Sequence, residues 1–203
     1  MLTFIDWFAG LGGMNFAFKA AGHKCVGFCE FENDNIKYYR MIHKAEDLWF
    51  QGNIQQVNIS EIPNADCYAL SPPLTVTEKM REIITIKMPK IIVIEADPYG
   101  TEFFLKRLPE LGYYVETEST RAAADAKDRH WWSYTVAQRD TNKKILPMGL
   151  DDYIENPETW GSKGFPKEAY ELIKNERYIN EGNVALHRLT QIRAVTEITK
   201  LLN

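Results

Sequence analysis

The sequence contains few of the residues that cross-link a small protein or hold a metal. Its 203 residues include three cysteines and four histidines. The cysteines form no CxxC pair and the histidines show no ligand spacing, so we expect neither a disulfide framework nor a bound metal. Cys25 and Cys29 fall within one apolar segment, where we expect them to pack rather than to react.

An excess of basic charge and long apolar runs are also absent. The formal net charge is −4, which provides no overall positive field, so we expect the chain alone to bind nucleic acid weakly. The N-terminus lacks the basic lead-in of a secretory signal, and no apolar run approaches the length of a membrane span. These absences predict a soluble intracellular protein, in the cytoplasm or in the nucleus or nucleoid, with no membrane partner.

The sequence does contain enough apolar material for a sizeable core. Hydrophobic residues make up 45% of the chain, which predicts a single domain over residues 1–203. Residues 141–164 are the most loop-like part, because they are polar and contain several prolines and glycines.

The first 32 residues follow the order strand, glycine turn, helix, strand and acid. Their apolar patterning predicts two strands flanking an amphipathic helix, over residues 3–8, 13–21 and 24–31. Gly22 ends the helix and Glu30 ends the second strand. The turn carries three glycines, Gly10, Gly12 and Gly13. In a βαβ unit of this kind the backbone approaches a ligand at the turn, and the acid reaches a ribose hydroxyl. The alternative is a plain strand-to-helix turn.

Helical and strand patterns alternate along the rest of the chain. Helices are predicted over 33–43, 77–87, 101–111 with an interruption at Pro109, 166–178 and 184–202. Strands are predicted over 47–54, 66–70, 91–95, 113–118 and 131–138. The last two strands fit an antiparallel hairpin at a sheet edge. The pattern predicts an α/β fold with a mostly parallel central sheet and helices on both faces.

The amino-acid sequence of the first strand–helix–strand segment forms a distinctive motif. Residues 6–13 read Asp-Trp-Phe-Ala-Gly-Leu-Gly-Gly, and Ala-Ala-Gly follows at 20–22 before Glu30. This stretch closely resembles the opening of the cytosine-C5 methyltransferases of DNA or tRNA-type substrates. The resemblance implies a Rossmann-like methyltransferase fold that binds S-adenosylmethionine or S-adenosylhomocysteine. It implies that Phe8 lies against the adenine, that the backbone of residues 10–13 passes the methionine part, and that Glu30 holds the ribose.

The resemblance extends to further candidate cofactor contacts. Asn53 stands where the family contacts the adenine amino group, although an ordinary polar turn is an equal alternative. Gly-Asn-Val at 182–184 resembles the family's last motif, which returns to the cofactor pocket. The implied cofactor-binding residues are Phe8, Ala9, Gly10, Leu11, Gly12, Gly13, Glu30, Phe31, Asn53, Ile54, Ser71 and Asn183.

The position that would carry the reaction departs from the family. Ser71 and two prolines match the family's Ser-Pro-Pro-Cys-Gln, but Leu74 stands where the nucleophilic cysteine would be. The family's thiolate attacks cytosine carbon 6 so that carbon 5 can accept a methyl group, and leucine has no lone pair to offer. Cys67 lies roughly 20 Å away along the preceding strand. Cys29 falls beside the expected cofactor, so neither cysteine is placed to replace the missing one.

Other positions that carry the family's chemistry match the family only in part. Glu95 stands where the family holds the cytosine ring nitrogen and amino group, and a strand-end acid without that role is the alternative. The family's arginine run is replaced by Asp128, Arg129 and His130. The aromatic pair at 131–132 can stack on a base or pack in the core. The short 141–164 loop stands in place of a target-recognition domain.

Several hypotheses about function therefore remain open. The first is a catalytically silent cytosine-C5 methyltransferase-like protein that still binds the cofactor and acts as a regulator or partner of an active methyltransferase subunit, another protein or nucleic acid. The second is an active S-adenosylmethionine-dependent nucleic-acid methyltransferase of altered chemistry. The third is one half of a split enzyme. Methylation of an exocyclic nitrogen is less favoured, because Leu74 is not the aromatic residue that follows Ser-Pro-Pro in those enzymes.

Overall fold

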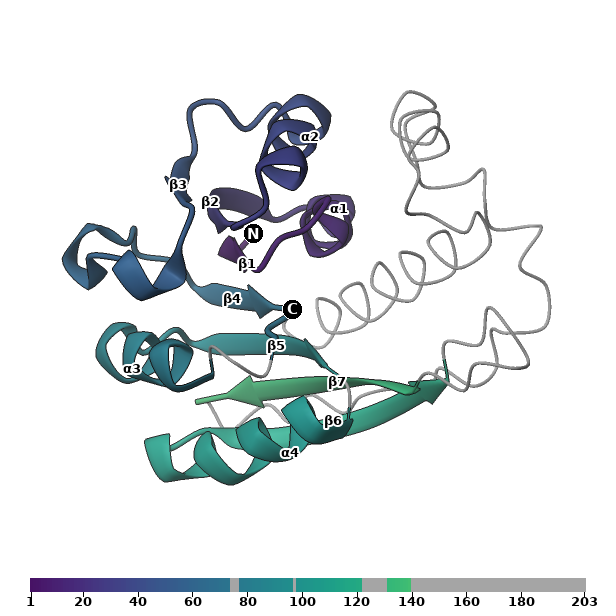
Figure 1. The fold of residues 1–203 in the computed structure, drawn as a ribbon. Helices are drawn as coiled ribbons and strands as arrows, with labels where there is room; N and C mark the ends of the chain where they lie inside the picture. The colour runs from purple at the N-terminus through teal and green to yellow at the C-terminus, as the bar shows by residue number, and fades with distance from the viewer. Residues whose placement is uncertain (74–76, 97, 122–130, 140–203) are drawn as a thin grey trace.

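The fold is organised around one mixed sheet. The computed structural model describes residues 1–73, 77–96, 98–121 and 131–139. Within them, seven strands lie in the order β3-β2-β1-β4-β5-β7-β6 (Figure 1). The strands β3, β2, β1, β4 and β5 are parallel to one another, whereas β7 runs antiparallel to both β5 and β6. The predicted mostly parallel sheet with an antiparallel edge hairpin is thus confirmed.

The elements alternate as the sequence indicates. The strands are β1 Thr3–Trp7, β2 Lys24–Cys29, β3 Trp49–Gln51, β4 Cys67–Leu70, β5 Ile91–Ala96, β6 Tyr114–Arg121 and β7 Trp131–Gln138. The α-helices are α1 Gly13–Ala20, α2 Asn33–His43, α3 Thr77–Lys87 and α4 Pro98–Arg107. Short 3-10 helices cover η1 Ile54–Gln56, η2 Ile59–Glu61 and η4 Pro109–Leu111.

Several predicted boundaries were wrong. The strand expected over 47–54 covers only Trp49–Gln51, and Ile54 begins η1. The helix expected over 101–111 begins earlier, at Pro98, and ends at Arg107, after which Pro109 opens a separate 3-10 turn. Proline fits the first turn of a helix because it has no N–H to leave unpaired there. The strand expected to end at residue 118 continues to Arg121, since its polar end pairs with β7 as far as Trp131. Pairing across the hairpin overrides the weak local pattern.

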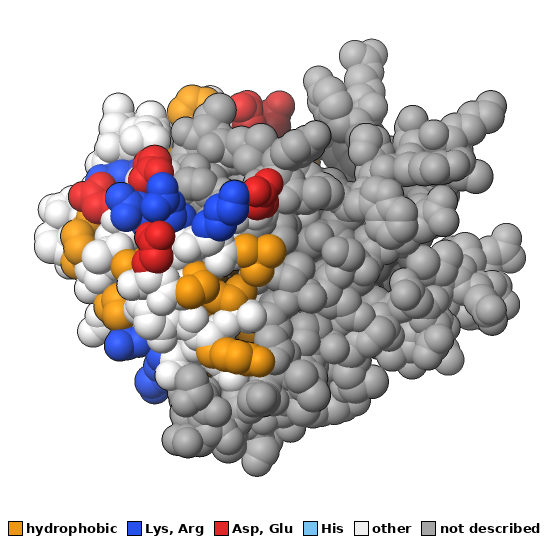
Figure 2. All heavy atoms as spheres, turned by 90° about the horizontal axis from the view of Figure 1, so that it is seen from below, with side chains coloured by type: hydrophobic (Ala, Val, Ile, Leu, Met, Phe, Trp, Pro, Cys, Tyr) orange, Lys and Arg blue, Asp and Glu red, His pale blue; other side chains and the backbone are white. Residues whose placement is uncertain are grey.

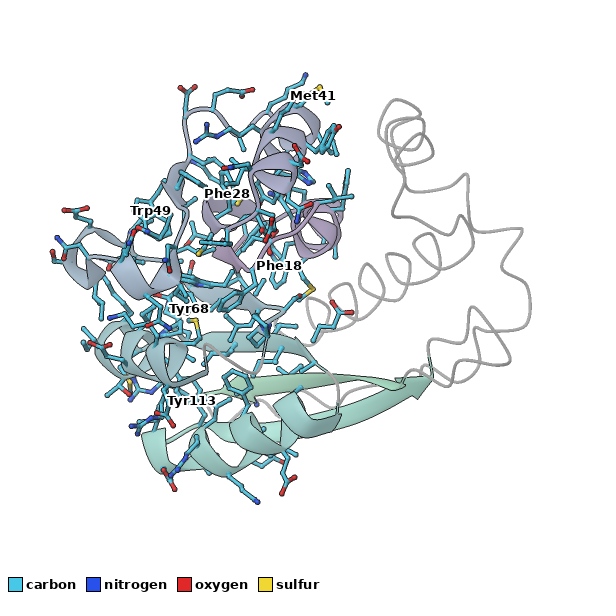
Figure 3. The ribbon with its side chains drawn as sticks, viewed as in Figure 1. Phe18, Phe28, Met41, Trp49, Tyr68 and Tyr113 are labelled. Carbon is cyan, nitrogen blue, oxygen red and sulfur yellow. The ribbon has the colours of Figure 1, made fainter. Side chains whose placement is uncertain are left out.

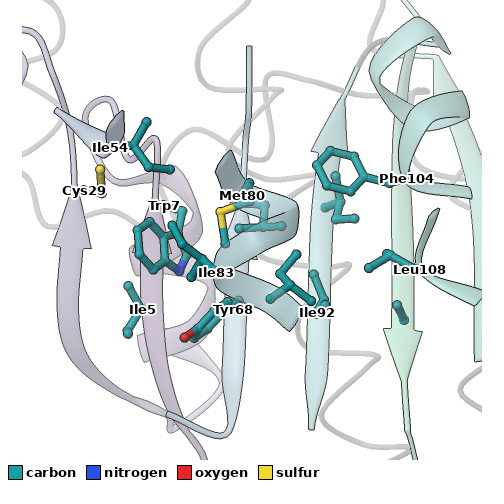
Figure 4. Close-up of a cluster of buried hydrophobic side chains, with 14 of the residues drawn as sticks. Ile5, Trp7, Cys29, Ile54, Tyr68, Met80, Ile83, Ile92, Phe104 and Leu108 are labelled. Carbon is teal, nitrogen blue, oxygen red and sulfur yellow. The ribbon is translucent and has the colours of Figure 1, made fainter. Parts of the chain in front are cut away.

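Alternation along the strands sends side chains to two cores. In β1, Ile5 and Trp7 face the core covered by α3 and α4, whereas Phe4 faces the core covered by α1. Figure 4 shows the first core, where Met80 and Ile83 of α3 lie over Tyr68 of β4, and Phe104 and Leu108 lie near β5 and β7. Because both faces of the parallel strands are covered, these strands read as nearly continuous apolar runs.

The second face also carries a stack of aromatic rings. Phe28 of β2 lies against Tyr39 of α2 with ring centroids 4.1 Å apart, and Phe18 of α1 stacks on Phe4 at 4.6 Å. Figure 3 labels Phe18 of α1 and Phe28 of β2 in the purple, N-terminal part of the ribbon. The first and second helices are thereby fixed to the strands whose ends form the candidate site.

A polar clamp ties the amino ends of the central strands. Asp66 accepts hydrogen bonds from the Thr3 backbone N–H at 3.0 Å and the Thr3 hydroxyl at 2.8 Å, and Lys90 Nζ lies 2.7 Å from its other oxygen. The Lys90 ammonium, helped by the Thr3 donors, lowers the pKa of Asp66 to about 2. Just before β4, Asp66 thus joins the start of β1 to Lys90, which precedes β5.

We expect Asp66→Asn to destabilise the protein in a pH-dependent way. A carboxyl group with a depressed folded-state pKa stabilises the fold above its ordinary pKa of about 4, and this contribution is lost as the pH falls through about 2. Urea unfolding at pH 7 should show a loss of about 1–2 kcal/mol that shrinks below pH 4. The control Asp47→Asn, on an exposed loop, should change little. A deficit that is the same at pH 7 and pH 3 would contradict this assignment.

Candidate functional site

A cavity of about 410 Å³ lies at the carboxyl ends of four neighbouring strands, β1 to β4. It is lined by Phe8, Cys29, Glu30, Phe31, Glu32, Gly52, Asn53, Ile54, Ser71 and Pro73. Its volume is typical of small-molecule pockets, which span roughly 300–1,000 Å³. The chain order reverses between β1 and β4, and open α/β sheets bind ligands at such switch points. The position therefore favours a ligand site.

Glu30 is the most firmly held polar side chain of the cavity. One carboxylate oxygen accepts the backbone N–H of Gly10 at 2.6 Å and the other accepts that of Glu32 at 2.8 Å, while the residue is 8% exposed. Each carboxylate oxygen has more than one lone pair, so both can accept further donors such as two ribose hydroxyls. The carboxylate is oriented by the backbone and still able to bind.

The chain leaves β1 in an unusual conformation at Phe8. This residue has φ of 58°, in the left-handed region that non-glycine residues rarely occupy. The next residue, Ala9, donates its N–H to the Cys29 carbonyl at 2.9 Å, which continues the pairing of β1 with β2. Backbone strain of this kind collects at functional sites, where the surrounding structure holds it. The turn places Phe8 in the cavity wall.

Asn53 forms a polar turn and also lines the cavity. Its side-chain oxygen accepts the backbone N–H of Gln55 at 2.9 Å and so caps η1, as a polar turn would. Its backbone carbonyl accepts Gln51 Nε2 at 2.8 Å. Because a carbonyl oxygen has two lone pairs, the capping bond leaves room for a second donor such as an adenine amino group. Asn53 also lines the cavity beside Ile54.

The glycine turn is open at Gly10 and closely packed at Gly12. A Cβ atom added to Gly10, whose φ is 53°, would have no neighbour within 4 Å, whereas one on Gly12 would lie 2.0 Å from His43 Nε2. Gly10 is therefore open, and Gly12 is required by contact with α2. The residues that line the cavity do not include Ala9, Gly10, Leu11, Gly12 or Gly13, although the Gly10 N–H fixes the Glu30 carboxylate from the turn.

Glu95 lies beside the cavity. It is 2% exposed near the end of β5, and the Ser71 hydroxyl lies 3.4 Å from its Oε2. The other sequence-predicted positions, Leu74, Asp128, Arg129, the 141–164 loop and Asn183, fall outside the described residues, as do the side chains of Trp131 and Trp132. The structure thus brings Ser71 and Glu95 together next to the candidate cofactor site.

The sequence placed Cys29 beside the expected cofactor, and this last residue of β2 does line the cavity. Sequence reasoning missed three lining residues, Glu32, Gly52 and Pro73, which follow the ends of β2, β3 and β4. Their positions one to three residues from a strand end were the available signal, because all parallel strands of a sheet end at the same edge.

Among the described residues, no group of three or more histidine, cysteine or acidic side chains could hold a metal. No helix in the same ranges is long and apolar enough to span a membrane.

Comparisons with known proteins find similarity in part of the sequence and in the fold. The model of the C-5 cytosine-specific DNA methylase family matches residues 2–74. A DNMT2 mutant from Spodoptera frugiperda is similar in structure, with 17% identity and a TM-score of 0.58 over 70% of this chain and 51% of that one. Dnmt2 of S. pombe shows 16% identity and a TM-score of 0.56 over 87% and 60% of the two chains.

A protein outside that family has a similar fold. A precorrin-6y C5,15-methyltransferase from Geobacter metallireducens shows 14% identity and a TM-score of 0.56 over 68% of this chain and 80% of that one. Comparison with curated proteins gives no match. The chain spans about half the length of the Spodoptera DNMT2. These structural likenesses, all under 25% identity, show the fold.

The fold is therefore the Rossmann-like fold of S-adenosylmethionine-dependent methyltransferases. Within that class, residues 2–74 are similar to the C-5 cytosine-specific DNA methylase family, since they match that family's model. The matched segment contains the glycine turn, Glu30 and Asn53, and it ends at Leu74.

The three cysteines of the chain are all buried and unpaired. Burial raises the pKa of Cys25 to about 11 and that of Cys29 to about 12, and it raises the pKa of Cys67 above the ordinary range of a thiol. Cys29 Sγ lies 3.9 Å from the Gly52 carbonyl, at the cavity wall. The thiolate is the reactive form, so these thiols are inert at neutral pH.

We expect the native protein to resist thiol reagents. At pH 8 a disulfide reagent such as dithionitrobenzoate should label fewer than one thiol per chain within minutes, and all three in urea, because unfolding removes the burial. The variant Ser60→Cys, at an exposed position, should gain one fast-reacting thiol as a positive control. Fast native labelling mapped to Cys29 would contradict its assignment as an inert wall residue.

Proposed function

We propose that this protein binds S-adenosylmethionine or S-adenosylhomocysteine in the cavity at the ends of β1 to β4 and does not methylate cytosine carbon 5. The observation that carries the binding proposal is the Glu30 carboxylate, held by two backbone N–H groups at the end of β2 and lining the cavity. The observation that carries the loss of activity is Leu74, which stands in the sequence where the resembled family has its nucleophilic cysteine.

The groups around the cavity fit the chemistry of the cofactor. The carboxylate of Glu30 can accept ribose hydroxyls, the Phe8 ring offers an apolar surface for adenine, and Asn53 offers an acceptor for the adenine amino group. Phe31 is 67% exposed, which is unusual for a phenylalanine, and a bound ligand would cover it. When bound, S-adenosylmethionine supplies an activated methyl group.

No cysteine of the chain is suited to replace the missing nucleophile. Cys67 begins β4, at the opposite end of that strand from Ser71, and Cys29 is buried in the wall of the cofactor cavity. The raised pKa values of all three thiols keep them protonated. Without a thiolate, carbon 5 of cytosine is not activated for methyl transfer.

These two properties support a regulatory or partner role in nucleic-acid modification. The net charge is −4, and four of the five basic groups of α3 and α4 form ion pairs with acids, such as Lys79 with Glu82 and Lys106 with Glu102. Figure 2 shows basic and acidic side chains side by side on the described part of one face. Such a surface gives weak attraction to phosphates, so the chain would act on nucleic acid through a partner such as an active methyltransferase subunit.

A second candidate is an active nucleic-acid methyltransferase of altered chemistry, or half of a split enzyme. The contact of the Ser71 hydroxyl with the buried Glu95 favours it, because a carboxylate that can accept from a cytosine amino group is retained beside the cavity.

We expect S-adenosylhomocysteine to bind, and Glu30→Gln to weaken binding by about 10–100-fold. The substitution removes the negative charge. It also places a glutamine NH₂, which is a donor, against one of the two backbone N–H groups that now donate to the carboxylate. Isothermal titration calorimetry measures the effect. Glu32→Gln removes the same charge from the cavity rim and should change the affinity less than about threefold. The binding proposal would be rejected if the unmodified protein showed no heat of binding at millimolar ligand.

We expect no transfer of labelled methyl groups to cytosine carbon 5 in DNA or RNA by the unmodified protein. Leu74→Cys should produce transfer at least about 100-fold above Leu74→Ser, because only the thiol can form the covalent adduct with carbon 6. Scintillation counting of methylated nucleosides measures the product. Label at carbon 5 from the unmodified protein would refute its inactivity, and label at another atom would favour altered chemistry.

A further inference from the structure

His43, the last residue of α2, makes a specific contact with the glycine turn. It is 6% exposed, and its Nε2 lies 2.9 Å from the carbonyl oxygen of Leu11. A carbonyl oxygen only accepts hydrogen bonds, so Nε2 carries the proton and donates. The contact joins residues 32 positions apart in the sequence and crosses from α2 to the turn that follows β1.

The His43 ring also fills the space where a side chain at Gly12 would be. Gly12 has φ of 84°, and an added Cβ would lie 2.0 Å from His43 Nε2 and 2.8 Å from Tyr39 Cε2. Tyr39 and His43 are four residues apart in α2 and therefore present one face of that helix to the turn. The absence of a side chain at Gly12 is explained by this close approach of α2.

Further contacts tie the same helix end to α1. The His43 ring lies 4.5 Å from the Phe16 ring, and Lys19 Nζ donates to the His43 carbonyl at 3.1 Å. On the opposite side of the turn, the Gly10 N–H donates to Glu30. The turn is therefore held between the end of α2 and the end of β2.

From this arrangement we infer that His43 is a positioning residue for the cofactor site. It holds the Leu11 carbonyl and the Gly12 backbone in place, which keeps the Gly10 N–H aligned with the Glu30 carboxylate. His43 does not line the cavity itself, and its effect is transmitted through the turn. This inference rests on the proposed binding of S-adenosylmethionine or S-adenosylhomocysteine.

The test compares two amide substitutions at His43. The side-chain nitrogen of glutamine can take the position of Nε2 and donate to Leu11, whereas that of asparagine reaches only as far as Nδ1. We expect His43→Asn to weaken S-adenosylhomocysteine binding about 10-fold by calorimetry and His43→Gln to stay within about threefold of the unmodified protein.

His23→Phe is the matched control. His23 is also buried and accepts the Leu2 N–H, but it lies before β2, at the opposite end of that strand from Glu30.

A second measurement separates this inference from the proposed function. Amide hydrogen exchange without ligand should be about 10-fold faster in residues 9–14 of His43→Asn, and unchanged there in His43→Gln and His23→Phe. If the unmodified protein binds no S-adenosylhomocysteine, the proposed function fails and this exchange pattern alone decides the role of His43. The inference is overturned if His43→Asn and His43→Gln show equal exchange in residues 9–14. It is also overturned if the protein binds S-adenosylhomocysteine and the two variants bind it with equal affinity. If His43→Asn does not fold, His43→Phe, which keeps the ring shape and lacks the donor, takes its place in both measurements.

Discussion

The candidate site depends on one carboxylate that joins two turns. Glu30 is 8% exposed and accepts the N–H of Gly10, from the turn after β1, and that of Glu32, from the turn after β2. A buried charge is costly unless hydrogen bonds compensate for the lost water, and charge-assisted bonds from backbone N–H groups do so. Because the two donors come from different turns, neither turn can move far without leaving the charge unsatisfied. The cavity wall is therefore shaped before any ligand binds.

The supports of the glycine turn lie on both of its sides. Gly10 faces Glu30 and open space, whereas Gly12 faces Tyr39 and His43 of α2. The two glycines thus serve different purposes, one at the open side of the turn and one in helix packing. The left-handed Phe8 at the start of the turn is tolerated because Ala9 pairs with Cys29 immediately after it. A site with this support needs little reorganisation to bind, which favours affinity.

Much of the fold could be predicted, since its signals are local. Helices over 33–43 and 77–87 and the strand over 131–138 have the predicted bounds, because apolar spacing and turn residues mark them directly. The errors at Pro98 and Arg121 arose where pairing or a proline outside the apolar pattern decided the boundary. For the site, the sequence predicted Glu30 from its strand-end position. It did not predict Glu32 or Pro73, because their place in the cavity wall depends on how the ends of neighbouring strands lie together.

By itself, the sequence determined the α/β class and the absence of a thiol at position 74. These follow from hydrophobic period and residue identity, which need no knowledge of distant contacts. Tertiary structure decided what each polar group does: Asn53 caps η1 at the edge of the cavity, His43 donates to Leu11, and Ser71 meets the buried Glu95. The physical reason is that hydrogen bonds act only over about 3 Å, so a partner many residues away is identified only when packing has brought the two chain segments together.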